Sequence, residues 1–104
     1  MNKSNIIKKG REVLNTEAGA IRNLSKGLDQ NFIKAVNLII KLEGKLILSG
    51  VGKSGNIANK LASSFTSTGV PSIYLNPVDA SHGDMGIVSQ GDVLIVLSNS
   101  GESY

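Results

Sequence analysis

The sequence of 104 residues contains no cysteine and no tryptophan, and only two prolines and one histidine. Without cysteine the chain can form no disulfide and no thiolate metal site, which favours a reducing compartment, and we expect a cytoplasmic protein. The longest apolar runs have about five residues, whereas a span of the bilayer needs roughly 20. Residues 1–10 also lack the apolar stretch of a signal peptide. We therefore expect no membrane partner.

The charge of the chain is unevenly distributed. The net charge of +3 combines +5 over residues 1–45 with −2 over residues 46–104. The lysines and arginines of the first part are spread singly and do not alternate with aromatic side chains that would stack on bases. We interpret them as solvated helix faces and expect no nucleic-acid partner.

Residues 1–44 have the spacing of helices. From Ser4 onward, apolar side chains recur at intervals of three, four and seven and form one stripe: Ile6, Ile7, Val13, Leu14, Ala18, Ile21 and Leu24. Gly27 is the expected end of this helix, and Asp29 is the expected N-cap of a second helix that runs to Gly44. No glycine-rich linker follows, so we expect residues 1–104 to belong to a single domain.

Residues 45–104 alternate between short apolar runs and one helical segment. We expect strands at residues 45–49, 72–75 and 92–97 and a helix at residues 54–66, which Gly69 ends. On that helix one apolar face is expected to carry Ile57, Leu61, Ala62 and Phe65. A strand–helix–strand order predicts an α/β fold with a parallel sheet built from βαβ units, and the N-terminal helices are expected to cover part of it.

The first loop of interest is the sequence GVGKSG at residues 50–55, directly after the first strand. It matches the G-x-G-x-x-G fingerprint of dinucleotide sites, but Asn76 stands where that fingerprint expects an acidic residue. A Walker A loop would need glycine at Ile47. Neither nucleotide motif is complete, so we expect no cofactor. The glycines alone would allow a tight turn, but a tight turn does not require Lys53.

Two further loops follow the other strands. Residues 98–103 (SNSGES) combine hydroxyl groups with a glycine at an expected helix start, which is typical of a phosphate cradle and also of a simple helix cap. Residues 76–86 contain the lone His82, either a ligand-facing residue or an ordinary polar one. With Asp79 and Asp84 it fits no standard metal spacing, and we expect no metal site. All three loops follow strands, where open α/β sheets bind ligands.

In combination the loops are more specific than each is separately. Residues 49–103 carry G-x-G-K-S-G, S-T-G, H-G-D-x-G and S-N-S-G-E-S in this order, and the chain resembles the sugar isomerase (SIS) domain family, especially its bacterial arabinose 5-phosphate isomerases. The resemblance implies a five-stranded parallel α/β sandwich of the flavodoxin-like, Rossmann type, of which this chain holds three strands. It also implies a homo-oligomer that interconverts arabinose 5-phosphate and ribulose 5-phosphate for lipopolysaccharide (Kdo) synthesis.

The resemblance also implies roles for individual residues. Lys53 is the expected catalytic residue, since its charge can stabilise an enediolate oxygen. The expected substrate-binding residues are Gly52, Ser54, Gly69, Val70, His82, Ser98, Asn99, Ser100 and Ser103. In the resembling enzymes an important glutamate follows the position of Tyr104, so we expect this chain to bind a sugar phosphate but to lack the catalytic base. The alternative is a non-catalytic module that binds sugar phosphates.

Overall fold

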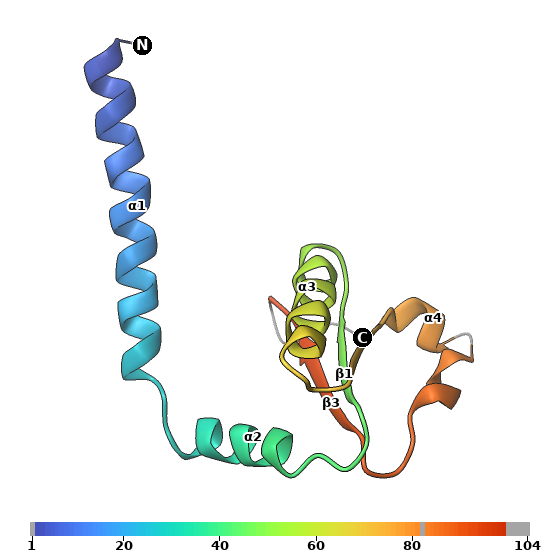
Figure 1. Ribbon diagram of the computed structural model, residues 1–104. Coiled ribbons are helices and arrows are strands. Elements are labelled where there is room, and N and C mark those ends of the chain that lie inside the picture. Colours follow the sequence, from blue (N-terminus) through green and yellow to red (C-terminus); the bar gives the residue numbers. More distant parts are fainter. Residues whose placement is uncertain (1, 82, 100–104) are drawn as a thin grey trace. The chain divides into compact units, whose positions relative to one another are not determined.

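The computed structural model describes residues 2–81 and 83–99 (Figure 1). Their elements are α1 (Lys3–Lys26), α2 (Gln30–Ile40), β1 (Leu46–Gly50), α3 (Lys53–Ser67), β2 (Ser72–Leu75), α4 (Pro77–Ser81), the 3-10 helix η1 (Asp84–Ile87) and β3 (Val93–Leu97). The chain divides into two compact units, residues 1–35 and 36–104, so the boundary lies inside α2. Over these described ranges, no helix is both long and apolar enough to cross a bilayer.

Two of the helix caps were expected from the sequence, and both are present. Gly27 is the C-cap of α1 as expected, and at the start of that helix the Asn2 side chain, for which no cap was predicted, accepts a hydrogen bond from the Asn5 amide (2.8 Å). The Asp29 carboxylate accepts from the Asn31 amide at 2.9 Å and caps α2 as predicted. Side chains that bind the first amides of a helix stabilise it by about 1 kcal/mol.

The predicted end of the second helix is wrong. We expected Gly44, whereas α2 ends at Ile40. The Gly44 amide donates instead to the carbonyl of Gly91 (3.0 Å), which precedes β3. A Cβ at Gly44 would collide with Oδ1 of Asp92, so the chain needs a glycine here for close approach rather than for a helix stop.

The sheet is parallel, with strand order β2-β1-β3. This confirms the predicted α/β class, and the strands begin and end within one residue of their expected positions. Because β1 is central, its Leu46, Ile47 and Leu48 are completely buried. Burying a side chain of this size is worth about 1.5–3 kcal/mol, so this strand is the centre of the core.

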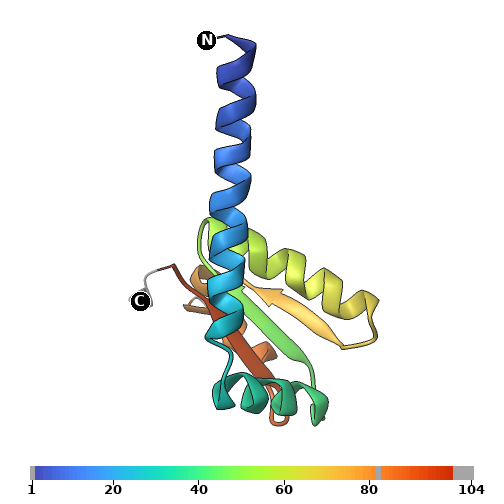
Figure 2. The same ribbon diagram turned by 90° about the vertical axis from the view of Figure 1, so that its left-hand side faces the viewer.

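Helix α3 covers one face of the sheet, and the segment with α4 and η1 lies on the other side (Figures 1 and 2). The contact with Leu46 and Leu48 is made by Ala58 and Ala62, whose small side chains let α3 approach the strands closely. The predicted apolar face of this helix is partly wrong, because Ile57 is 56% exposed. Leu61 and Phe65 pack against the core as expected.

An ion pair joins β1 and β3 at their amino ends. The Lys45 ammonium lies 2.7 Å from Oδ2 of Asp92, whose side chain is only 4% exposed. The same carboxylate accepts from the amides of Lys45 and Ser89, each at 2.8 Å. These bonds to the charged form hold the pKa of Asp92 well below its ordinary value. The register of the two strands is therefore anchored at this edge.

Candidate functional site at the carboxyl ends of the strands

The three strands end level with one another. Ser49 of β1 pairs with Leu75 of β2 and with Val96 of β3, and Gly50 pairs with Leu97. The segments that follow the strands therefore leave the sheet at the same edge. This is the edge at which open α/β sheets bind ligands, because several loops converge there.

Two glycines of the GVGKSG loop bring α3 against the end of β1. A Cβ on Gly55 would lie 2.5 Å from the Gly50 carbonyl oxygen and 2.9 Å from the Tyr74 hydroxyl. A Cβ on Gly50 would lie 2.9 Å from the backbone of Ser54 and 3.0 Å from the Leu97 carbonyl oxygen. No real side chain fits at these separations. The helix start is thus held directly over the junction of β1 and β3.

The remaining glycine of the loop, Gly52, is required because its backbone has a positive φ angle. Its φ of 63° and ψ of −130° lie in a region that favours glycine, although no atom lies within 4 Å of its Cβ position. Gly52 is the N-cap of α3 and offers no side chain to the first amides. An uncapped helix start presents backbone N–H groups and the positive end of the helix dipole, which together attract anions.

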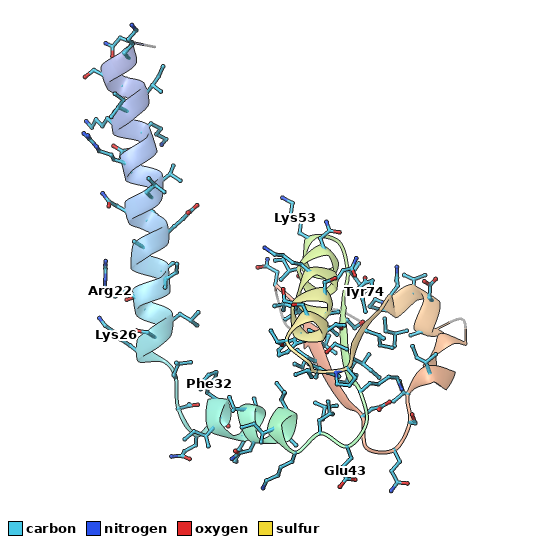
Figure 3. All side chains as sticks on the ribbon, viewed as in Figure 1. Arg22, Lys26, Phe32, Glu43, Lys53 and Tyr74 are labelled. Atoms are coloured by element: carbon cyan, nitrogen blue, oxygen red, sulfur yellow. The ribbon has the colours of Figure 1, made fainter. Side chains whose placement is uncertain are left out.

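Lys53 and Ser54 form the first turn of α3. Lys53 is exposed and extends from the top of α3 in Figure 3, whereas Ser54 is half-buried. In the described part of the chain, no carboxylate forms an ion pair with Lys53. The turn therefore combines a lysine ammonium, a hydroxyl and helix amides without a bound counter-charge. Such a combination can hold a phosphate or stabilise a developing oxyanion.

The predicted residues of the other two loops are described only in part. Ser98 and Asn99 are exposed and directly follow β3, so they lie at the same edge as Gly52 and Lys53. His82, Ser100 and Ser103 lie outside the described residues. Their roles remain predictions.

Gly69 and Val70 are not brought to this edge. They follow the far end of α3, which at 15 residues is about 22 Å long, and precede β2. Gly69 has a φ of 96° and donates to the Thr66 carbonyl at 3.1 Å, while Val70 donates to Phe65 at 3.0 Å. These are the two bonds of a Schellman motif, so both residues have a structural role in ending α3. Within this chain they do not share a site with Lys53.

Sequence reasoning missed the roles that Tyr74 and Asn76 have in shaping the site. The Tyr74 hydroxyl donates to the Gly50 carbonyl oxygen at 2.9 Å and so holds the beginning of the GVGKSG loop. Asn76 ends β2, and its side chain accepts from the Val78 amide at 2.9 Å, which starts α4. The signal for Tyr74 was its position in the strand, since β2 residues alternate between faces and Tyr74 is level with the core residue Leu48.

No cluster of three or more metal-binding side chains occurs among the described residues. The groups that the structure does place at the carboxyl edge are amides, hydroxyls and one ammonium. Together with the parallel sheet, they define an α/β domain whose carboxyl edge carries groups that suit an anion, as in domains that hold phosphorylated small molecules by loops after the strands.

Comparisons with known proteins identify the family. Residues 39–104 match the SIS domain. The arabinose 5-phosphate isomerase KdsD of Escherichia coli K12 is 45% identical over 94 residues, which are 90% of this chain and 29% of that protein. The arabinose 5-phosphate isomerase GutQ of Salmonella typhi is 41% identical over 96 residues, 92% of this chain and 30% of that protein. A solved protein of Escherichia coli CFT073 in complex with arabinose 5-phosphate has a TM-score of 0.92 at 38% identity and covers 99% of this chain and 55% of that one.

The chain therefore belongs to the SIS domain family, as the order of its loop motifs predicted. Its similarity extends to sugar-phosphate isomerases within that family. The chain spans less than a third of the length of these curated relatives and about half of the solved one.

Proposed function

We propose that this chain supplies the sugar-phosphate-binding edge of an arabinose 5-phosphate isomerase. The observation that carries this proposal is the convergence of the GVGKSG loop and the end of β3 at one edge, with Gly50 paired to Leu97. Identity of 45% to KdsD, together with the structural likeness to a protein in complex with arabinose 5-phosphate, supports the choice of this sugar phosphate. We expect the product to be ribulose 5-phosphate.

The chemistry of the edge suits the first half of such a reaction. Moving a proton between C1 and C2 of an aldose passes through an enediolate, whose negative charge needs a positioned cation or N–H donors. Lys53 and the first amides of α3 provide both. Ser98 and Asn99, with Ser100, Ser103 and His82, are the proposed groups for the phosphate and the sugar hydroxyls. A base must also be present, and we place it in parts of the enzyme that this chain does not match.

The test is an NMR titration of the 15N-labelled chain with arabinose 5-phosphate. We expect shift changes at the amides of residues 50–55 and 98–99. The phosphate-free sugar arabinose should produce almost none, because the charged interactions are lost. Lys53→Ala should weaken binding at least about tenfold, since a charge-assisted hydrogen bond is worth about 1.5–3 kcal/mol. Lys60→Ala is the matched control, because Lys60 is an exposed lysine of the same helix about two turns away.

Shift changes confined to Gly69 and Val70 would contradict the placement of the site at the carboxyl edge. No binding of arabinose 5-phosphate at any concentration would reject the proposed substrate and leave only the family. A non-catalytic module that binds sugar phosphates would show the same titration, so the two functions separate only by turnover in the complete enzyme.

A further inference from the structure

The hydrogen-bond ladder between β1 and β2 cannot continue to the end of β1. The Leu46 amide donates to the Pro71 carbonyl at 2.7 Å, one residue before its register partner Ser72. In a parallel pair the carbonyl of a residue accepts from the residue after its partner, so the Gly50 carbonyl would need the N–H of residue 77. That residue is Pro77, which has no N–H. The buried Gly50 therefore lacks a ladder donor for its carbonyl.

The Tyr74 hydroxyl replaces the missing donor. It donates to the Gly50 carbonyl oxygen at 2.9 Å. Tyr74 is level with Leu48, and Gly50 lies two residues further along β1, which is about 6.6 Å at the rise of a strand. A phenol is long enough to cover this distance, whereas a serine or threonine hydroxyl is not. The tyrosine also packs against the core, which holds its hydroxyl in place.

A second hydroxyl fixes Tyr74 at this register. Ser49 is only 5% exposed, and its hydroxyl donates to the Leu75 carbonyl at 2.6 Å. Ser49 is level with Leu75, which directly follows Tyr74. Because consecutive residues of a strand point to opposite faces, the two hydroxyls act from opposite faces of the sheet. Each comes from one strand and binds a carbonyl of the other, and we call the hydroxyls of Ser49 and Tyr74 the latch.

The latch lies directly against the first turn of α3. A Cβ on Gly55 would lie 2.5 Å from the Gly50 carbonyl oxygen and 2.9 Å from the Tyr74 hydroxyl. The hydroxyl, the carbonyl and the start of the helix therefore meet at one place. The Gly50 carbonyl also belongs to the peptide that begins the loop, two residues before Lys53. A displacement of this peptide would therefore move the first amides of α3 and Lys53 with it.

We propose that Tyr74 is a positioning residue of the carboxyl edge, and that the latch holds the first turn of α3 and Lys53 in the geometry that binds a phosphate. This inference rests on the proposed function and adds the groups that order the binding site before the ligand arrives. Groups that are already ordered lose less freedom on binding, so the latch raises affinity without touching the ligand. It acts on the binding of any phosphate rather than on the choice of sugar.

The first test needs no ligand. The Asn56 amide donates to the Gly52 carbonyl at 3.1 Å and closes the first turn of α3, so its hydrogen exchange reports whether that turn is formed. Tyr74→Phe deletes the hydroxyl and keeps the ring. It should speed the exchange of the Asn56 amide about tenfold, because the buried Gly50 carbonyl loses its donor. Ser49→Ala should act in the same direction with a smaller effect.

Thr66→Val is the matched control. The Thr66 hydroxyl also joins α3 to β2, since it donates to the Ser72 carbonyl at 3.1 Å, but it does so near the other end of the helix. Its loss should leave the exchange of the Asn56 amide unaltered. The amide of Leu48, which is completely buried in the central strand, reports opening of the whole fold and corrects for a general loss of stability.

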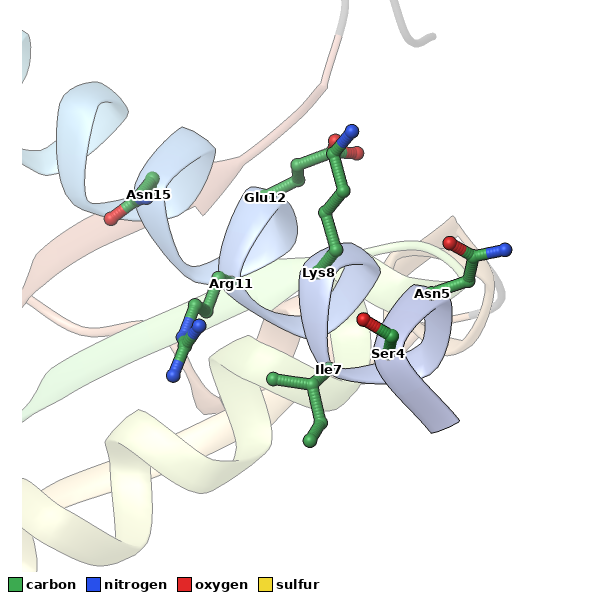
Figure 4. A pocket seen from close by; sticks show the side chains of 7 residues that line it. All are labelled: Ser4, Asn5, Ile7, Lys8, Arg11, Glu12 and Asn15. Carbon is green, nitrogen blue, oxygen red and sulfur yellow. The ribbon is translucent and has the colours of Figure 1, made fainter. Parts of the chain in front are cut away.

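The second test measures affinity by NMR titration with inorganic phosphate and with arabinose 5-phosphate, at a temperature at which each variant is folded. Tyr74→Phe should raise both dissociation constants about fivefold, because a less ordered site loses more freedom on binding. Thr66→Val should change neither. The recess on α1 (Figure 4) is the internal reference for unspecific attraction of anions, because Lys8 and Arg11 line it and it belongs to the other compact unit. Its amides should respond equally in all variants.

Unchanged dissociation constants and unchanged exchange of the Asn56 amide in Tyr74→Phe would overturn the proposal. So would a Thr66→Val chain that binds phosphate as weakly as Tyr74→Phe, or a Tyr74→Phe chain that loses affinity for arabinose 5-phosphate alone. If Tyr74→Phe does not fold, Ser49→Ala decides by the same two measurements. A wild-type chain that binds neither anion would reject the proposed function instead, and the exchange rates would then still decide whether the Tyr74 hydroxyl positions the loop.

Discussion

At the scale of single residues, Asp92 anchors the amino edge of the sheet through Lys45 and Ser89. Its pKa is lowered from the ordinary value of 3.8, chiefly by the backbone N–H of Lys45 and then by the Lys45 side chain. A carboxyl group whose pKa is lower in the folded state stabilises the fold above its unfolded pKa, and the contribution disappears as the pH falls below that value.

We therefore expect Asp92→Asn to lower the urea midpoint at pH 7. The difference from wild type should shrink as the pH falls below about 4, where the unfolded carboxyl group takes up its proton. Urea titrations of both chains at pH 7, 5 and 3 measure this difference. Glu43→Gln makes the same chemical change at an exposed acid nearby and should leave the midpoint at pH 7 unaltered. A difference that grew on acidification would contradict the assigned role of the carboxylate.

Lys53 is the residue on which the proposed chemistry depends most. In a full-length relative that carries the same loop, alanine at the position of Lys53 should lower kcat about 100-fold or more and change KM far less. The reason is that its charge is needed chiefly when the enediolate forms. Steady-state kinetics with arabinose 5-phosphate measure kcat and KM separately, and alanine at the position of Lys60 is the control. A raised KM with an unchanged kcat would assign Lys53 to substrate binding alone.

At the scale of elements, the position of α3 depends on the glycines at its start. Gly55→Ala should destabilise the chain by about 1–3 kcal/mol, because the new methyl group meets the Gly50 carbonyl and the Tyr74 hydroxyl. Gly19→Ala is the control, since nothing lies within 4 Å of that position inside α1. This change should instead raise helix stability by about 0.5–1 kcal/mol. The midpoints of thermal unfolding of the two variants measure these changes in stability. Equal effects of Gly55→Ala and Gly19→Ala would show that α3 does not contact β1 as closely as described.

The elements that could be predicted are those whose pattern of apolar residues lies within a few neighbouring positions of the sequence. The strands and α3 were predicted nearly to the residue, because each is a short apolar run or a helical repeat, and glycines such as Gly69 mark where it ends. The predicted end of α2 was wrong, because Gly44 is held by a hydrogen bond to the distant Gly91. Helix α4 was missed, because its start depends on the hydrogen bond from the Val78 amide to the Asn76 side chain inside a loop. The loop at residues 50–55 was predicted as a site from its sequence. The separation of Gly69 and Val70 from that loop already follows from the predicted helix between them, and only the resemblance to the family had joined these two residues to the site.

At the scale of the whole molecule, the far side of the sheet is partly uncovered. On edge strand β3, Leu94 is 49% and Val96 is 61% exposed, whereas Ile47 on the same face of the central strand is fully buried. The matched relatives are longer than this chain. In them we expect further segments to cover this face and to complete the pocket around Lys53, which has no carboxylate within ion-pair distance among the described residues.

This expectation separates binding from catalysis in the 104-residue chain. The amides, hydroxyls and ammonium at the carboxyl edge suffice for a few charge-assisted hydrogen bonds, so arabinose 5-phosphate should bind with a dissociation constant of about 1 mM, equivalent to about −4 kcal/mol. Proton transfer between C1 and C2 needs a base next to the substrate, and the chain should therefore form no ribulose 5-phosphate. A coupled assay for ribulose 5-phosphate, run beside the NMR titration on the same sample, measures both. Turnover by the 104-residue chain would mean that a side chain within it, such as His82 or Glu102, acts as the base.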